Sequence, residues 1–448
     1  MTSVPTPERL HNPEEGSVHI IGGGLSGLAS AVRLVQAGCQ PVIYESTDHA
    51  GGRCRSLFEP TLDRLIDNGN HLLLSGNHAT MDYLKIIGAR EELAVAPRAV
   101  YTFVDIRDGK RWSVRPNRGR FPWWVLSESR RVPDSRPWDY FAALGLSRVK
   151  HGKTVAEYFD TDRKIFERFW EPLTVAVLNA GAHEGAACLL WPVIQLTFGK
   201  GEAACRPCFP CQGLSGTFVD PALAWLSVNG AEVNFQHRIR GFKRRSDTNG
   251  STITELDFAN ASIPILNKDR VILAVPPDSA SSLLPDIPVP SNSRAIVNVH
   301  FLLPHPPPED ARKTRLMGII GGHAQWLFLR EDVASATVSA ADKVALEQAE
   351  TIAQRIWPEV VSALGMGKES PLSPYRVIKE KRGTFAQIPD QLPLRAKTRT
   401  AYNNLFLAGD WTDTGLPATI EGAVKSGFAA AEAVLKDKEK SRRNGLWP

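Results

Sequence analysis

The pattern of apolar and polar positions is clearest near the start of the chain. A short, mostly apolar run at 18–21 predicts a strand, and the stretch LASAVRLVQAG predicts a helix that ends at Gly38. A second strand is expected over 40–44, and a glycine-rich turn at 22–27 separates the first strand from the helix. The order strand, turn, helix, strand is the building unit of an α/β fold with a parallel sheet.

Apolar runs further along the chain extend this architecture. Additional strands are expected at 231–239, 253–258, 271–275 and 404–411. Two prolines directly after 271–275 would stop that strand. A helix rich in small residues is expected over 421–435. The pattern therefore predicts a Rossmann-type α/β fold to which several distant segments contribute.

Length and composition limit the class of protein. A chain of 448 residues exceeds one typical domain, and 43% hydrophobic with 23% charged residues excludes a disordered or collagen-like chain. No run reaches the roughly 18 to 20 apolar residues of a spanning helix, and the N-terminus lacks the layout of a signal peptide. We therefore expect a cytoplasmic protein that touches a membrane only from its surface. The net charge of +5 is too small to indicate nucleic acid and fits phosphorylated ligands or acidic lipid better.

The turn at 22–27 carries the G-x-G-x-x-G dinucleotide fingerprint in the context that it requires. The first glycine would allow the tight turn, the second would let the backbone approach a pyrophosphate, and the third would let helix and strand pack closely. Free N–H groups at the helix start would bind phosphates, and an acidic residue ending the second strand would accept from ribose hydroxyls. The residues expected at this site are Gly22, Gly24, Leu25, Ser26, Gly27 and Glu45.

Two further segments resemble the amine oxidase and phytoene desaturase superfamily. These are Gly-Gly-Arg at 51–53 and the stretch NLFLAGDW at 404–411, which is followed by GLPATI at 415–420. The resemblance implies FAD as cofactor. It implies contacts to FAD from Gly51, Gly52, Arg53, Asn68, Arg238, Ile239, Gly409, Asp410, Ala418, Thr419 and Ile420. Because the last cysteine is Cys211, the terminal segment has no cysteine for a covalent bond, and noncovalent FAD is expected.

The same resemblance predicts a division into two domains. Residues 15–75, 214–285 and 375–440 would form a discontinuous FAD-binding domain. Residues 76–213 and 286–374 would form an inserted α+β domain that binds the substrate, with residues 1–14 and 441–448 as tails. Only one dinucleotide fingerprint is present, so no separate NAD(P)H domain is predicted.

Within the superfamily, three blocks look like hydroxysqualene dehydroxylases, squalene-associated FAD enzymes of bacterial hopanoid pathways. The blocks are DNGNHLLL at 67–74, FWEPL at 169–173 with Leu178-Asn179, and LFLAGDWTDTGLPATIEGA at 405–423. Asn70 departs from the glutamine expected in that subgroup. The resemblance implies removal of the hydroxyl of hydroxysqualene to give squalene, with other squalene-pathway enzymes as candidate partners.

Two other classes of function stay open. A carotenoid-type desaturase or an amine oxidase would use the same FAD frame in the oxidising direction, and an amine oxidase would need an aromatic cage near the flavin. A non-catalytic flavin-binding partner protein would have a closed pocket.

The proposed reaction needs a proton donor, because hydroxide is a poor leaving group. Glu171 lies in an apolar context that favours a neutral acid, and His71 follows the first flavin block. Asn179 could position the hydroxyl. Each also has a structural interpretation: a salt bridge or helix cap for the glutamate, and a loop contact for the histidine. Glu421 is either a site residue or a partner of a helix N-terminus.

Three cysteines, Cys205, Cys208 and Cys211, have a spacing similar to part of a zinc or iron–sulfur site, with Cys188 as a fourth candidate ligand. Prolines interrupt the run, no histidine is close, and the proposed reaction needs no metal. No metal is predicted.

Basic residues and tryptophans alternate between 107 and 138. Asp108-Gly109 predicts a hairpin turn between strands at 100–106 and 111–115. The apolar run 121–126, with Trp123 and Trp124 beside many arginines, fits docking on an anionic bilayer. The alternative is a solvated loop whose indoles pack inside, and nucleic acid is not expected as a partner.

Overall fold

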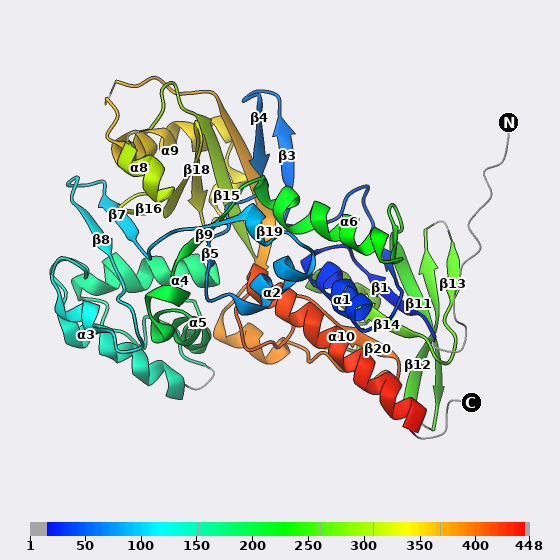
Figure 1. Cartoon of the computed structure of the whole chain (residues 1–448). Coiled ribbons are helices and arrows are strands. Elements are labelled where there is room, and N and C mark those ends of the chain that lie inside the picture. The colour runs from blue at the N-terminus through cyan, green and yellow to red at the C-terminus, as the bar shows by residue number, and fades with distance from the viewer. Residues whose placement is uncertain are drawn as a thin grey trace.

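The computed structural model describes residues 16–149, 152–248, 250–259, 261–307, 309–367 and 369–443. Its first layer is a five-stranded, fully parallel sheet in the order β10-β2-β1-β14-β20 (Figure 1). The strands are β1 (Val18–Ile21), β2 (Pro41–Tyr44), β10 (Glu232–Asn234), β14 (Arg270–Leu273) and β20 (Leu405–Leu407). Segments far apart in sequence thus meet in one sheet.

Four helices pack with this sheet. They are α1 (Leu25–Gln36), α2 (His78–Ile86), α6 (Asp220–Val228) and α10 (Ile420–Arg443). Fully buried Leu28 and Val32 of α1 share one apolar cluster with Val424 of α10 and Tyr83 of α2. This burial explains the apolar spacing of the first helix, because one stripe of α1 faces the sheet while α10 covers it from outside.

The second layer is a seven-stranded sheet in the order β19-β15-β18-β17-β16-β7-β8. Its strands are β7 (Tyr101–Asp105), β8 (Arg111–Val114), β15 (Ser293–Leu302), β16 (Leu316–Ile320), β17 (Trp326–Arg330), β18 (Val333–Val338) and β19 (Tyr375–Phe385). Only the pair β16–β7 is parallel. Helix α9 (Ala349–Leu364) covers one face, and the short α8 (Glu309–Thr314) lies beside β16 and β17.

Shorter elements complete the described chain. Small sheets are β3 (Ser56–Glu59) with β4 (Arg64–Asp67), β9 (Pro207–Pro210) between β5 (Leu73–Leu74) and β6 (Leu93–Val95), and β12 (Gly250–Phe258) between β11 (Ile239–Asp247) and β13 (Ser262–Pro264). The remaining α-helices are α3 (Pro137–Phe141), α4 (Glu171–Leu178), α5 (Leu190–Leu196) and α7 (Pro277–Leu283). Helices α3, α4 and α5 lie at the end of the molecule opposite β11–β13 (Figure 1).

The structure corrects several predicted elements. The single strand expected at 231–239 is two strands, because a turn at Gln236 (φ +59°) bends the chain between β10 and β11. The last strand is only Leu405–Leu407, and the terminal helix continues to Arg443, so residues 441–443 are not a tail. The tail predicted at 1–14 lies outside the described residues.

The position of β19 bears on the predicted domain boundary at 375. This strand, assigned to the FAD-binding part, forms the edge of the seven-stranded sheet through its antiparallel pairing with β15. We therefore propose to place that boundary after Phe385. The rest of the division into domains stays a prediction.

Candidate active site

The glycine turn has the geometry that the fingerprint requires. Gly22 has φ +110°, and a Cβ there would lie 2.4 Å from the carbonyl oxygen of Ala274. A Cβ on Gly27 would lie 1.9 Å from the oxygen of Gly22, so only glycine allows α1 to pack this closely. A Cβ on Gly24 would meet no atom within 4 Å. The start of α1 thus faces open space, as a bound pyrophosphate requires.

Glu45 lies beside this turn at the end of β2. Its Oε2 accepts from the N–H of Gly23 at 2.8 Å, and its Oε1 accepts from the N–H and hydroxyl of Thr47 at 2.9 and 3.0 Å. Its carbonyl oxygen accepts from the N–H of His237, which brings the following Arg238 and Ile239 next to the same corner. The carboxylate is therefore oriented by the turn, and its contact with ribose stays a prediction.

The Gly-Gly-Arg segment packs onto the glycine turn. The N–H of Gly51 donates to the oxygen of Gly23 at 2.8 Å, and a Cβ on Gly52 would lie 3.5 Å from the Cα of Gly24. Gly51 has φ +101°, which also favours glycine. This close approach explains why glycines occupy positions 51 and 52. It also places Arg53 beside Asp410.

Arg53 and Asp410 form the ionic centre of the site. Nη2 of Arg53 lies 2.8 Å from Oδ1 of Asp410, and Nη1 donates to the oxygen of Gly383 at 2.6 Å. The nearby carboxylate of Asp410 raises the pKa of Arg53. Nδ2 of Asn68 reaches the oxygen of Arg53 at 3.4 Å and Oε2 of Glu380 at 3.3 Å. Four distant segments meet here, three of them named by the resemblance.

Two residues at this centre were missed by the sequence reasoning. Arg395 is buried and donates to the backbone oxygens of Asp410, Trp411 and Thr412, so it holds the loop after β20. Burial lowers the pKa of this guanidinium. Its acceptors are backbone carbonyls, which leave no signal in the sequence.

Gln387 is the second missed residue, and it is fully buried. Its Nε2 donates to the oxygen of Leu178 at 2.8 Å, and its Oε1 accepts from the N–H of Ala418 at 2.7 Å. Its backbone oxygen accepts from the N–H of Ala186 at 2.9 Å. One side chain thus ties the end of α4 to the loop that leads through Thr419 and Ile420 into α10.

The two proton-donor candidates have different environments. Glu171 is the first residue of α4, with both carboxylate oxygens 3.3 Å from the N–H of Ala182, and burial raises its pKa. Burial lowers the pKa of His71 to about 4, so its imidazole is neutral at pH 7. Both groups are shifted toward the neutral form, but only the carboxyl gains proton affinity.

Asn179 and Glu421 are engaged in structural bonds. Asn179, left-handed at φ +50°, donates to the hydroxyl of Thr384 at 3.1 Å and accepts from the N–H of Ala340 at 2.7 Å. Glu421 accepts from the N–H groups of Ala79 and Thr80 at 2.9 Å, at the start of α2. We assign Asn179 to joining α4 with the seven-stranded sheet, and Glu421 to capping α2.

His71 lies at a small cavity of about 60 Å³, lined by both polar and apolar side chains, between the seven-stranded sheet and the segment after β4. The polar side chains that line it are Asp67, Asn70, His71, His300, Arg315, Arg330 and Ser335. Nδ2 of Asn70, the departure from the subgroup pattern, donates to Oγ1 of Thr337 at 2.9 Å. Next to it, Nδ2 of buried Asn298 has no hydrogen-bond partner among the described residues. The cavity has polar partners and enough volume for water.

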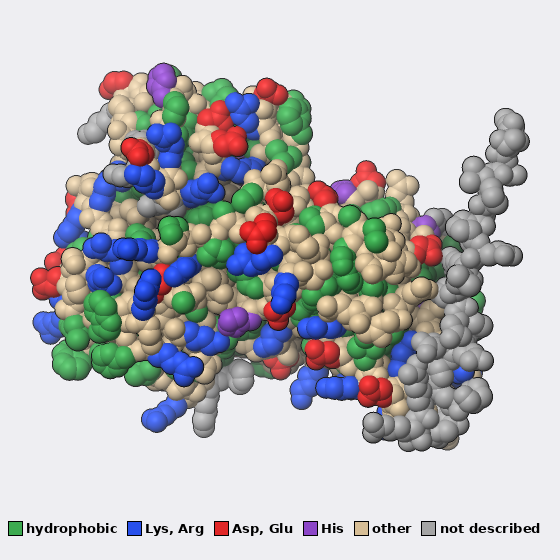
Figure 2. Space-filling view, viewed as in Figure 1, with side chains coloured by type: hydrophobic (Ala, Val, Ile, Leu, Met, Phe, Trp, Pro, Cys, Tyr) green, Lys and Arg blue, Asp and Glu red, His purple; other side chains and the backbone are tan. Residues whose placement is uncertain are grey.

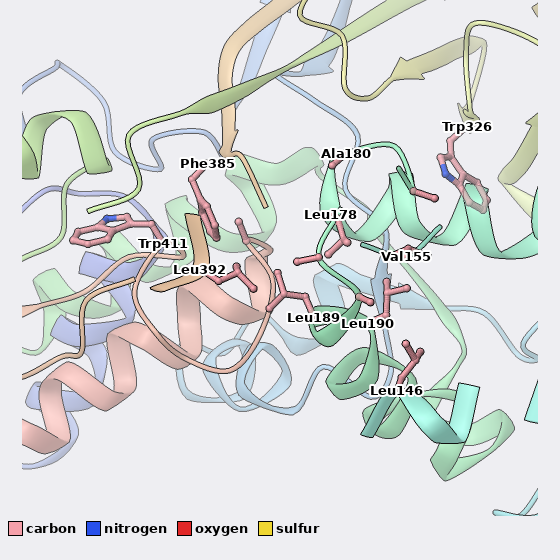
Figure 3. Close-up of a cluster of buried hydrophobic side chains, with 14 of the residues drawn as sticks. Leu146, Val155, Leu178, Ala180, Leu189, Leu190, Trp326, Phe385, Leu392 and Trp411 are labelled. Atoms are coloured by element: carbon pink, nitrogen blue, oxygen red, sulfur yellow. The ribbon is translucent and has the colours of Figure 1, made fainter. Parts of the chain in front are cut away.

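An apolar cluster lies on the other side of the site (Figure 3). It runs from Leu146, Val155, Leu178, Ala180, Leu189 and Leu190 to Phe385, Leu392 and Trp411. Trp411 is held by a bond from its Nε1 to the oxygen of Val275 at 2.9 Å. The cluster brings apolar side chains of the α4–α5 region to the loop that carries Asp410.

The three closely spaced cysteines differ in burial and do not form a metal site among the described residues. Cys205 and Cys208 are buried while Cys211 is exposed. Burial raises the pKa of Cys205, and that of Cys208 to about 12, so both thiols keep their protons at pH 7. Across the ranges given above, no group of three or more His, Cys, Asp or Glu side chains is arranged to hold a metal ion.

The basic and indole-rich segment forms the hairpin expected, with β7 and β8 on either side of Asp108-Gly109. The sequence left open whether the indoles of 123–124 dock on a bilayer or pack inside, and the structure places Trp124 inside. This residue is 4% exposed and packs edge-on against Tyr140, whereas Trp123 is 45% exposed. In the part of the chain that the structure covers, no helix is both long and apolar enough to cross a bilayer.

The chain is similar to known flavin-containing enzymes. A family model described as flavin containing amine oxidoreductase matches residues 25–435. Hydroxysqualene dehydroxylase of Zymomonas mobilis is 40% identical over 417 residues (93% of this chain, 98% of that protein), and that of Rhodopseudomonas palustris is 41% identical over 420 residues (94% and 98%). Among solved structures, cyclohexylamine oxidase from Brevibacterium oxydans has a TM-score of 0.68 at 16% identity, covering 95% of this chain and 100% of that one. These similarities confirm the predicted fold class.

Proposed function

Because the chain belongs to the hydroxysqualene dehydroxylases among the flavin-containing amine oxidoreductases, we propose that it removes the hydroxyl group of hydroxysqualene and puts hydrogen in its place, giving squalene. The observation that carries this proposal is the identity of about 40% over nearly the full length of two proteins of that name. These matches span 93% and 94% of the chain.

The cofactor that we propose is noncovalent FAD, which when bound would supply the reducing equivalents. The start of α1 would hold the pyrophosphate, and Glu45 the ribose. Arg53 and Asp410, joined at 2.8 Å, would lie along the ribityl and pyrophosphate part. The open space in front of Gly24 supports this placement. The segment 404–421 contains no cysteine, which supports noncovalent binding.

The residue that we propose as proton donor is Glu171. Its raised pKa favours a carboxyl group that still holds its proton when the substrate binds. Its proton would pass to the hydroxyl oxygen as the C–O bond breaks, so that the oxygen leaves as water. His71, whose imidazole is neutral at pH 7, would hold a hydrogen bond at the small cavity and carry no charge.

The apolar cluster supports a lipid substrate. A carbocation next to a double bond would react with any nearby water, so the walls must exclude it. Leu178, Leu190 and Phe385 belong to this cluster and are buried. Since substrate and product are both lipids, we propose that the enzyme works at the cytoplasmic membrane surface, where other squalene-pathway enzymes would exchange substrate with it.

A carotenoid-type desaturase is the second candidate. A probable zeta-carotene desaturase of Synechococcus elongatus is 23% identical over 94% of this chain, well below the identity to the dehydroxylases. Anaerobic incubation of the flavin-reduced protein with hydroxysqualene separates the two, with extraction and mass spectrometry of the lipid. We expect squalene. Unchanged hydroxysqualene, together with new double bonds in a carotene precursor offered to the oxidised protein, would overturn the proposal.

A further inference from the structure

The corner around α3 exposes an unusual group of apolar side chains. Eleven large hydrophobic residues are exposed in the described part of the chain, and five of them fall between 121 and 144. We call these five the apolar corner: Phe121 (67% exposed), Trp123 (45%), Leu126 (60%), Trp138 (75%) and Leu144 (60%). Figure 2 shows hydrophobic side chains gathered where Figure 1 places α3, with Lys and Arg around them. A cluster of this kind marks an interaction surface.

The backbone beneath the apolar corner is packed, so the exposure is fixed by the fold. Trp124 and Val125, between the exposed residues of the 3-10 turn Trp123–Leu126, are buried. The N–H of Trp124 donates to Oδ1 of Asn117 at 3.0 Å. The hydroxyl of Tyr140 accepts from the N–H of Val132 at 2.9 Å, which joins the next loop to α3. Trp123 and Leu126 therefore face solvent, while Trp124 and Val125 between them face the interior.

The charge around the apolar corner is positive. Exposed arginines near it in sequence are Arg115, Arg118, Arg120, Arg136 and Arg148. Among the described residues none of the five forms an ion pair within 4 Å; Arg118 lowers the pKa of Glu202 from further away, and Arg115 donates to the backbone oxygen of Ser129. The acids between 115 and 149 are already neutralised by other bases: Glu128 by Arg131, Asp134 by Arg168 and Asp139 by Arg163, at 2.7 to 3.2 Å. In addition, the Arg130 guanidinium lies over the Trp123 ring, 4.7 Å from its centroid.

We propose that the apolar corner docks the enzyme on an anionic lipid bilayer. Its indoles and aliphatic side chains would enter the boundary between headgroups and acyl chains, and the exposed arginines would contact lipid phosphates. Charge complementarity selects the bilayer as occupant, because exposed apolar side chains bordered by exposed arginines match an anionic interface. The proposal deepens the proposed function, since a lipid substrate has to be taken from a membrane.

The apolar corner also lies over the interior that leads to the candidate active site. Trp124, Tyr140 and Leu146, directly beneath it, belong to the same apolar cluster as Leu190 and Trp411 (Figure 3). A lipid entering at this corner would therefore meet apolar side chains all the way to the loop that carries Asp410.

Vesicle flotation of the full-length protein tests the proposal without any substrate. The vesicles are phosphatidylcholine alone, or phosphatidylcholine with phosphatidylglycerol. We expect binding to the anionic vesicles only, weakened by added salt. The double variant Phe121→Ser/Trp138→Ser should lose at least about tenfold in vesicle affinity, whereas Phe58→Ser/Leu346→Ser, an equally exposed pair outside the corner (59% and 82%), should bind like the parent.

A second pair of double variants tests the contribution of the arginines in the same vesicle assay. Arg120→Gln/Arg136→Gln should reduce affinity for anionic vesicles about tenfold or more, since each base near such a surface changes binding roughly fivefold. Arg240→Gln/Arg245→Gln, exposed on β11 at the opposite end, should leave it unchanged. Equal losses in both pairs, unaltered binding of the corner variants, or no flotation of the parent would overturn the docking surface. Squalene formation from detergent-solubilised substrate, measured separately, would still decide the proposed function.

Discussion

The cofactor side and the substrate side of the candidate active site differ in the kinds of groups that form them. On the cofactor side, backbone N–H groups, glycines and the Arg53–Asp410 pair meet at short distances, and the side chains are paired with one another. On the substrate side lie the apolar cluster and two groups, Glu171 and His71, that burial shifts toward their neutral forms. The fold thus keeps its ion pair on the cofactor side, whereas the titratable groups on the substrate side are held in their neutral forms.

The largest effect is expected on the cofactor side, from Gly24→Val. No atom lies within 4 Å of a Cβ there, and φ is −70°, so the side chain fits the folded chain but occupies the place of the pyrophosphate. The purified variant should lack flavin absorbance while its apo form melts like the parent apo form. Gly27→Ala is the contrasting control, because its Cβ would strike the backbone and should lower the melting temperature itself. A yellow Gly24→Val protein would contradict the placement.

On the substrate side, Glu171→Gln should slow squalene formation by roughly 100-fold or more, the usual contribution of a general acid. FAD content and melting temperature should stay unchanged. The parent rate should fall as pH rises through the raised pKa of this carboxyl, because the acid then loses its proton, and the variant should lack that limb. His71→Asn serves as the rival variant. If both variants turn over at the parent rate, the proton comes from elsewhere.

A third test concerns buried His300, whose pKa burial lowers to about 4. The unfolded chain, with a pKa near 6.5, binds a proton at a higher pH than the folded chain does, so stability falls as pH drops from about 6.5 toward 4. Between pH 7 and 5 this group should contribute about 2 kcal/mol of that loss. Chemical denaturation at the two pH values measures it. His300→Gln should reduce the difference.

The smallest effect is expected from Glu421→Gln. The carboxylate accepts from both Ala79 and Thr80 at the start of α2, so losing its charge and one acceptor should cost about 1 kcal/mol of stability. Thermal melting should show a decrease of a few degrees with unchanged FAD content. Loss of FAD without loss of stability would instead place this residue at the cofactor.

The cofactor side could be predicted from sequence because its requirements are local. Glycine spacing reports directly where a Cβ cannot fit, as at Gly22 and Gly27. Arg395 and Gln387 could not be found in this way, because their partners are backbone groups of loops that meet only in the folded chain. The two indoles at 123–124 show the same limit, since one turn of 3-10 helix sends adjacent side chains to opposite sides without a repeating pattern.

The strand β19 has a consequence for how the enzyme admits its substrate. It is paired along β15 in the seven-stranded sheet, and its far end provides the oxygen of Gly383 to Arg53 and the hydroxyl of Thr384 to Asn179. The strand belongs to the seven-stranded sheet, and its last residues also contact the cofactor side of the site. Moving the seven-stranded sheet away from the glycine turn would have to break the hydrogen bond from Arg53 to Gly383. We therefore expect any opening between the two sheets to require release of Arg53, and expect substrate to enter by displacement of side chains and loops.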